Sequence, residues 1–230
     1  MTDIVLASNN KKKIAELRRL LDENLSVDVR VLSLRDIGFD GDIDEFGKSF
    51  ESNSLIKASV PAGLGYIGIA DDSGLCVDAL GGEPGIYSAR YAEPFGEGED
   101  KDAANRAKLL RKLDGKPTEE RGGGFVCVAS LVLPEDSGYV IPERYRASAD
   151  FAAEAGVDAA RSATVRGECR GYILEEERGE GGFGYDSLFY SEETCCSFAE
   201  ATADAKNTVS HRGRAMREFV CLIDEILTSK

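Results

Sequence analysis

Three consecutive lysines, residues 11–13, open a predicted helix directly after the polar turn Ser-Asn-Asn at residues 8–10. The N-terminus of a helix carries a partial positive charge, so cations there are mildly destabilising unless an anion compensates them. The same helix start exposes backbone N–H groups that can bind a phosphate. Because the glycine-rich Walker pattern is absent, the segment predicts a phosphate cradle of another kind, with a solvated lysine cluster on a surface helix as the alternative.

Two adjacent carboxylates, Asp71 and Asp72, follow the apolar run of residues 66–70, which predicts a buried strand that stops at Asp71. An α/β sheet places its ligands just beyond the carboxyl edge of its strands. Magnesium takes oxygen ligands and binds through one or two carboxylates together with substrate phosphates. The pair therefore predicts a magnesium site beside the cradle, with Glu45 from an acidic loop as a second ligand, and a plain turn is the alternative.

Two later segments carry groups that could bind a nucleoside. In the run GGFGYDSLF, residues 181–189, glycines flank Phe183, and a ring presented in this way can stack on a nucleobase. Residues 206–215, KNTVSHRGRA, place the sole histidine, His211, beside Arg212 at the start of the final predicted helix, where donors could read a base edge or neutralise a phosphate. The alternatives are a hydrophobic hairpin turn for the first segment and a local cap or surface residue for the histidine.

The elements that would position these groups alternate between strand and helix in the first third of the chain. A strand at 4–7 leads into the lysine-rich helix, a second strand spans 27–34, and a helix starts near Ser49 until Pro61 ends or kinks it. An amphipathic helix follows at 100–113. Three strand-like runs at 125–134, 139–151 and 163–177 then predict an antiparallel or mixed sheet. A last helix begins near Ser210, and residues 134–163 are the place expected for a family-specific insertion.

Composition excludes several classes of function. The 230 residues carry a formal net charge of −14 and no basic stripe, which argues against a nucleic-acid polymer as partner. No apolar run reaches the roughly 20 residues that span a bilayer, and the N-terminus lacks a cleavage-site pattern. We therefore expect a cytoplasmic protein with no membrane partner. The six cysteines are scattered, so neither a disulfide framework nor a zinc site is expected.

Five segments, in order, resemble the inosine triphosphate pyrophosphatase family, also described as non-canonical purine nucleoside triphosphate pyrophosphatases. They are LASNNKKKIAELRRLL, DEFGKSFESNSLIKA, IADDSGLCVDALGGEPGIYSARYA, GGFGYDSLF and SHRGRAM, which together span nearly the whole chain. The resemblance implies an α/β fold, an elongated mixed sheet with flanking helices and two lobes around a central cleft. It also implies a single pyrophosphatase domain over residues 1–230 that is commonly a homodimer.

The resemblance further implies a role for each matching residue. Asp72 would be the general base and, with Glu45, would bind Mg²⁺. The triphosphate would be held by Ser8, Asn9, Asn10, Lys11, Lys12, Lys13 and Lys57, and the remainder of the substrate by Ser73, Phe183, Gly184, Tyr185, Asp186, Lys206, His211 and Arg212. Two features depart from the family pattern: Ser187 stands where proline usually follows the Gly-Tyr-Asp triplet, and residues 134–163 are atypical.

The activity implied is hydrolysis of non-canonical purine nucleoside triphosphates, inosine, deoxyinosine and xanthosine triphosphates, to the monophosphate and pyrophosphate. This would remove deaminated purines from the nucleotide pool. Two other hypotheses remain. A nucleotide pyrophosphatase of the septum-formation type shares the fold and could prefer pyrimidines, and a catalytically silent nucleotide sensor would need no base.

Overall fold

The computed structural model describes residues 2–8 and 11–229, and of residues 11–13 and 16 it describes the backbone only. One mixed sheet of seven strands has the order β2-β1-β3-β4-β5-β6-β7. Its strands are β1 (Thr2–Leu6), β2 (Val29–Ser33), β3 (Ile67–Val77), β4 (Gly122–Val132), β5 (Ser162–Ile173), β6 (Phe189–Ser191) and β7 (Cys196–Ser197). β1 pairs in parallel with both β2 and β3, whereas β6 is antiparallel to β5 and to β7.

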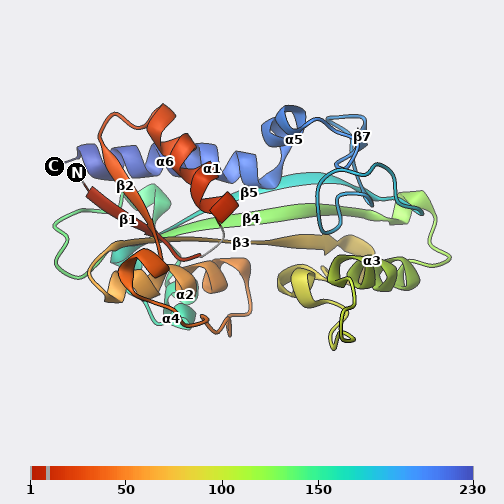
Figure 1. Ribbon diagram of the computed structural model, residues 1–230, viewed down its shortest axis with the longest axis horizontal. Helices are drawn as coiled ribbons and strands as arrows, with labels where there is room; N and C mark the ends of the chain where they lie inside the picture. The colour runs from red at the N-terminus through yellow and green to blue at the C-terminus, as the bar shows by residue number, and fades with distance from the viewer. Residues whose placement is uncertain (1, 9–10, 230) are drawn as a thin grey trace. The chain divides into compact units, whose positions relative to one another are not determined.

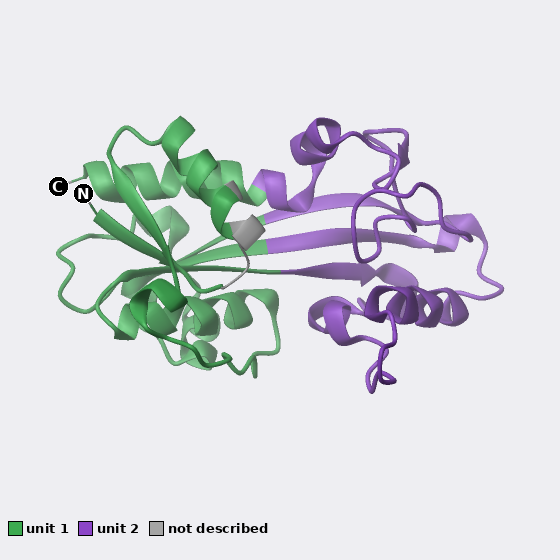
Figure 2. Cartoon of the chain, viewed as in Figure 1, with its two compact units in different colours: residues 1–72, 128–166, 215–230 green, residues 73–127, 167–214 purple. Residues whose placement is uncertain are grey.

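The helices are α1 (Lys11–Asn24), α2 (Phe50–Gly63), α3 (Lys101–Lys112), α4 (Ala149–Ala155), α5 (Ala203–Val209) and α6 (His211–Thr228). Short 3₁₀ turns connect several of them, the longest at Gly85–Arg90. The chain forms two compact units, shown in Figure 2. Unit 1 comprises residues 1–72, 128–166 and 215–230, and unit 2 comprises residues 73–127 and 167–214. The strands β3, β4 and β5 each contribute residues to both units.

Unit 1 has apolar layers on both faces of its part of the sheet. In Figure 1, α1 and α6 cover one face, and α2 and α4 cover the other. The first layer joins Ile4 and Ile69 of the sheet to Phe219 of α6. The second joins Val5 and Ala70, which alternate with them, to the helices α2 and α4.

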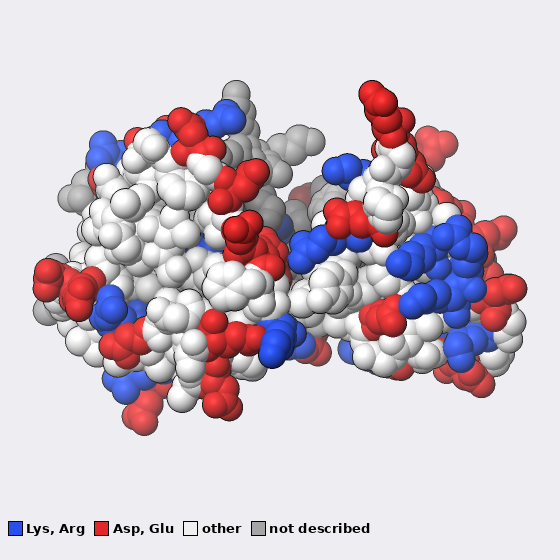
Figure 3. All heavy atoms as spheres, turned by 90° about the horizontal axis from the view of Figure 1, so that it is seen from below, with Lys and Arg blue, Asp and Glu red and all other residues white. Residues whose placement is uncertain are grey.

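Unit 2 has a separate core rich in aromatic rings. Leu109 of α3 packs with the rings of Phe125, Phe189 and Phe198, all of them buried. The centroids of the Phe125 and Phe189 rings lie 4.8 Å apart in an edge-on arrangement, which aromatic pairs favour. Figure 3 shows basic side chains gathered over part of unit 2, where α3 carries five of them between Lys101 and Lys112.

Both edges of the sheet are short. β7 has two residues, and β2, at the other edge, has five. On β2, the carbonyl oxygen of Val31 accepts two hydrogen bonds from Arg18 of α1, from Nε at 3.1 Å and from Nη2 at 2.7 Å. The neighbouring Arg30 pairs with Asp3 of β1, Nη2 to Oδ2 at 2.6 Å.

Two local predictions are wrong, and one alternative of a third is excluded. β3 does not stop at Asp71 but continues to Val77, because after its pairing with β1 ends at Ile69 the neighbouring strand β4 remains as its partner and overrides the turn preference of aspartate. The run 139–151 is not a strand: Pro142 has no N–H to donate to a ladder, and Ser148 caps α4 by accepting from the Phe151 N–H. The sequence predicts that Pro61 ends or kinks its helix; α2 continues to Gly63, so Pro61 does not end it, and the kink stays a prediction.

The predicted α/β class, a mixed sheet with flanking helices, is confirmed. The elongated shape and the cleft between lobes stay predictions. No helix among residues 2–8 and 11–229 is long and apolar enough to cross a membrane. Residues 134–163 are folded into unit 1, since Ala147, Ala152 and Ala155 join the layer formed around α2.

Candidate active site

Lys57 of α2 lies between two carboxylates in unit 1. Its Nζ is 3.0 Å from Oε1 of Glu45 and 2.9 Å from Oδ1 of Asp72. The side chains of Lys57 and Asp72 are each 13% exposed, and that of Glu45 is 26% exposed. The structure therefore brings together three of the residues predicted to bind the metal and the triphosphate.

Strand alternation and a helix cap place these groups. Asp72 alternates on β3 with Asp71, so it shares the face of Ala70, which packs in the layer formed around α2. Helix α2 begins at a favourable cap, since Ser49 Oγ accepts the Ser52 N–H at 3.0 Å. Lys57, in the middle of α2, reaches the same face.

The loop that carries Glu45 is anchored by residues that the sequence did not single out. The Gly47 N–H donates to Oδ1 of Asn53 at 2.9 Å, and the Lys48 N–H donates to Oε1 of Glu154 at 3.1 Å. Asn53 is fully buried in α2, and Glu154 belongs to α4 in the atypical segment. The Asn53 link is local, six residues along the chain, but nothing in the sequence indicates the Glu154 link, which exists only after α2 and α4 pack together.

The electrostatics of the site favour a protonated lysine and a basic carboxylate. Burial lowers the pKa of Lys57, but Asp72, Glu45 and Asp71 outweigh it, so the pKa lies above its ordinary value. Burial raises the pKa of Asp72, and the nearby Glu45 and Asp71 raise it further, whereas Lys57 lowers it. The raising effects are larger together, so the pKa of Asp72 also lies above its ordinary value. A carboxylate with a raised pKa accepts a proton more readily, which suits a general base.

The donor set fits a hard cation. Oδ2 of Asp72 is buried and has no hydrogen-bond partner among the described residues, although buried polar atoms are ordinarily satisfied. Two carboxylates meet here, Glu45 and Asp72, and magnesium needs no more than that from the protein when phosphates complete its ligands. The described part of the chain has no cluster of three or more acidic, histidine or cysteine side chains that could hold a metal alone.

The predicted phosphate cradle follows β1 in the same unit. The Ala7 N–H donates to the Ile69 carbonyl at 2.8 Å, so the chain leaves β1 beside the part of β3 that leads into Asp71 and Asp72. Ser8 is half-buried there, and α1 begins at Lys11. Asn9 and Asn10 lie outside the described residues, as do the side chains of residues 11–13.

In unit 2, three of the predicted nucleoside-binding residues contact one another. Oδ2 of the buried Asp186 accepts the Phe183 N–H at 2.8 Å and is 2.5 Å from Nζ of Lys206. The Lys206 ammonium lies over the Phe183 ring, 5.1 Å from its centroid, and over the Phe198 ring at 5.3 Å. The Phe183 side chain remains 77% exposed, so a face of its ring is available for stacking.

Two glycines allow this loop to close. Gly182 has φ +77°, and a Cβ there would lie 2.2 Å from Oδ2 of Asp186. Gly184 has φ +60°, a conformation that glycine adopts without strain. Tyr185 is buried in the core of unit 2, and its hydroxyl donates to the Ser88 carbonyl at 2.9 Å. The Tyr185 ring therefore anchors the loop and is itself withdrawn from solvent.

The remaining predicted residues also belong to unit 2. His211 opens α6, and its ring stacks on that of Phe125 with centroids 4.8 Å apart. His211 and Arg212 are both half-buried. Lys206 precedes them in α5, and Ser73, half-buried in β3, is the first residue of the unit.

The carboxylates and lysine of unit 1 and the exposed ring of Phe183 in unit 2 define a class of protein. It is an α/β nucleotide-binding protein in which two carboxylates and a buried lysine are suited to phosphate chemistry with a divalent cation. The model of the Ham1 family matches residues 4–222. The chain belongs to this family, which confirms the resemblance found in the sequence.

The relatives are similar along nearly their whole length. A dITP/XTP pyrophosphatase of Geobacter sulfurreducens is 43% identical over 217 residues, 94% of each protein, and one of Frankia alni is 42% identical over 230 residues, 98% of this chain and 99% of the relative. The solved structure of a HAM1 protein from Coxiella burnetii gives a TM-score of 0.79 at 32% identity, covering 98% of this chain and 100% of that one.

Proposed function

We propose that this chain hydrolyses non-canonical purine nucleoside triphosphates, those of inosine, deoxyinosine and xanthosine, to the monophosphate and pyrophosphate. The observation that carries the proposal is the Glu45–Lys57–Asp72 group, with one Asp72 oxygen unpartnered among the described residues. Its support is a set of relatives named dITP/XTP pyrophosphatases that match over nearly the whole chain. The work of such an enzyme, clearing deaminated purines from the nucleotide pool, belongs in the cytoplasm.

The chemistry assigns a task to each group in unit 1. Asp72 accepts a proton from the water that attacks phosphorus, and the bond to the departing pyrophosphate breaks. Lys57, with Lys13 and the other residues from Ser8 to Lys12, neutralises the charge that moves onto the leaving group. Glu45 and Asp72 would hold Mg²⁺, which supplies further positive charge to the triphosphate when it is bound.

The base is proposed to bind in unit 2. Phe183 offers a ring face, and Lys206, His211 and Arg212 carry mainly donors. The other residues proposed to bind the nucleoside are Ser73, Gly184, Tyr185 and Asp186. Inosine and xanthosine have an acceptor at position 6 where adenosine has an amino donor. A donor-lined site leaves groups unpaired against adenosine, and unmet buried hydrogen bonds can discriminate by about 10,000-fold or more.

A panel of triphosphates tests the function. We expect pyrophosphate release from inosine, deoxyinosine and xanthosine triphosphates with magnesium, little release without it, and a kcat/KM for adenosine triphosphate that is lower by about 10,000-fold. Equal kcat/KM for inosine and adenosine triphosphates would refute donor-based selection. Preference for pyrimidines would favour the septum-formation type, and binding without release of pyrophosphate would favour a sensor.

We also propose that residues 1–230 act as one domain, because β3, β4 and β5 each supply residues to both units and neither unit holds these strands complete. The strongly acidic charge of −14 supports a free nucleotide, and not a nucleic-acid polymer, as the partner.

We also propose a homodimer, for which the apolar loop at residues 85–92 offers Ile86, Tyr87 and Tyr91 as candidates for a buried patch. Tyr91 is 7% exposed and donates to Glu83 at 2.8 Å, so its ring belongs to the core of unit 2, whereas Tyr87 remains 57% exposed. Light scattering at micromolar concentration is expected to give twice the 24.8 kDa chain mass. Tyr87→Glu should lower this mass and Val140→Glu, at a comparably exposed site in unit 1, should not. A single-chain mass for the unmodified protein would reject the dimer.

A further inference from the structure

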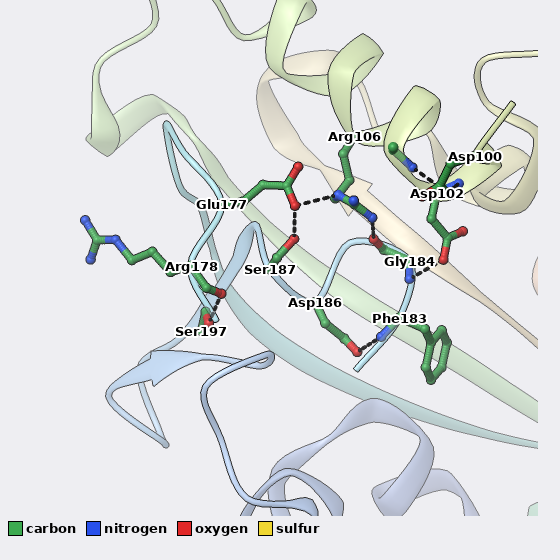
Figure 4. A network of polar contacts seen from close by, with 11 residues as sticks. Asp100, Asp102, Arg106, Glu177, Arg178, Phe183, Gly184, Asp186, Ser187 and Ser197 are labelled. Atoms are coloured by element: carbon green, nitrogen blue, oxygen red, sulfur yellow. Dashed lines mark hydrogen bonds and ion pairs between the residues drawn. The ribbon is translucent and has the colours of Figure 1, made fainter. Parts of the chain in front are cut away.

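Two side chains of α3 hold both hydrogen-bonding groups of Gly184 (Figure 4). Oδ2 of Asp102 accepts the Gly184 N–H at 2.8 Å, and Nη1 of Arg106 donates to the Gly184 carbonyl at 2.9 Å. Asp102 and Arg106 are four residues apart, which places them on one face of the helix. Gly184 is therefore clamped through both its N–H and its carbonyl, and without these bonds the backbone of a glycine, which has no Cβ, would be free to vary.

Arg106 is itself fixed by a second link to the same loop. Its Nε forms an ion pair with Oε2 of Glu177 at 2.9 Å, and this oxygen also accepts the Ser187 hydroxyl at 2.8 Å. The Arg106 side chain is only 17% exposed, so solvent competes little for its guanidinium. Figure 4 shows the chain of contacts from α3 through Glu177 to Ser187. A serine at the position where proline usually follows the triplet thus supplies a hydroxyl that ties down the far end of the loop.

Phe183 lies directly before the clamped glycine. Its N–H is held by Asp186, which also pairs with Lys206, whereas its ring is 77% exposed and has the Lys206 ammonium as a neighbour. Because most of the ring is exposed, its placement depends on the backbone that α3 and Asp186 hold.

We propose that Asp102 and Arg106 are positioning residues for the base platform: they hold the loop that presents Phe183 and so set the affinity for the purine base. The proposal rests on the proposed function, since it takes residues 183–186 to bind the nucleoside. Ordering a loop before the ligand arrives removes an entropic cost from binding. Loss of the clamp therefore weakens base binding and leaves the phosphate chemistry of unit 1 unchanged.

The kinetic test is Arg106→Met, which keeps an apolar stem and removes the guanidinium. We expect KM for inosine triphosphate to rise about tenfold while kcat stays within about threefold, because uniform binding is lost and not transition-state stabilisation. Arg106→Lys, which retains a donor without the fork, should give an intermediate KM. Arg111→Met on the same helix, an exposed arginine, is the matched control and should leave both constants unchanged.

A second measurement needs no substrate. The chain has no tryptophan, so Phe183→Trp creates a single fluorescent reporter in the loop. Adding Arg106→Met or Asp102→Ala to this variant should lower the fluorescence anisotropy of Trp at position 183 and raise its quenching by acrylamide, with both signals unchanged by Arg111→Met. Should Arg106→Met fail to fold, Glu177→Ala tests the same link from a side chain 46% exposed, with Glu176→Ala as its control.

The outcomes separate the two proposals. If the unmodified protein releases pyrophosphate from inosine triphosphate but Arg106→Met changes KM less than twofold, or leaves the reporter as ordered as before, the clamp has no positioning role. A fall in kcat at unchanged KM would likewise overturn it. If the unmodified protein releases no pyrophosphate, the proposed function fails whatever the reporter shows.

Discussion

Asp72→Asn is expected to lower kcat for inosine triphosphate about 100-fold to 10,000-fold, the usual contribution of a general base. Asparagine is nearly isosteric with aspartate, so it can still face Lys57, but it cannot accept the proton or serve as an anionic ligand. The Lys57 ammonium keeps Glu45 as its partner at 3.0 Å, so folding should survive. Steady-state pyrophosphate release and nucleotide binding would be measured together.

The matched control is Asp44→Asn, an exposed carboxylate next to Glu45 in the same loop. It should leave kcat unchanged. Hydrolysis by Asp72→Asn at close to the unmodified rate would show that Asp72 is not the general base. Weaker nucleotide binding with an unchanged kcat would show that Asp72 contributes to substrate binding and not to the chemical step.

Lys57→Met should damage both catalysis and stability. Removing one member of a buried ion pair leaves an uncompensated charge, which typically costs about 3–5 kcal/mol in the free energy of unfolding. Lys57 is also the group that lowers the pKa of Asp72. Without it this pKa rises further, Asp72 is protonated over a wider range, and the acid limb of kcat moves to higher pH.

Urea unfolding and a pH profile of kcat would measure the two effects of Lys57→Met. Lys48→Met, at an exposed lysine near the start of the same helix, is the control. An acid limb that stays in place, with unfolding unchanged, would show that the bridge between Glu45 and Asp72 has no electrostatic role.

Elements with a strong period could be predicted closely from the sequence. The amphipathic helix expected at 100–113 is α3 at Lys101–Lys112, because Asp100 caps it by accepting the N–H groups of Asp102 and Ala103. The final helix, expected near Ser210, begins at His211. In both, apolar spacing and the end signals agree, so local and tertiary preferences give one answer.

The failures have tertiary causes. Aspartate in sequence favours a turn, yet Asp71 and Asp72 lie inside β3, which continues with β4 as its neighbour after its pairing with β1 ends at Ile69. The candidate site shows the same division. Residue types indicated Glu45, Lys57 and Asp72 one by one, but the ammonium bridge between them requires α2 to lie on one face of β3. The clamp of α3 on Gly184 has no sequence signal, because helix and loop are 82 residues apart.

The bidentate contact from Arg18 to the Val31 carbonyl has a consequence for solubility and assembly. An outermost strand with free backbone groups invites another chain to add to the sheet, and such addition leads to open-ended aggregates. Here the Val31 carbonyl on β2 already accepts two hydrogen bonds, at 3.1 and 2.7 Å. The charged Arg30 directly precedes Val31, and the strand has only five residues. The opposite edge strand, with two residues, is too short to template a partner. Fibrillar growth of this protein through strand addition at either edge of the sheet is therefore disfavoured.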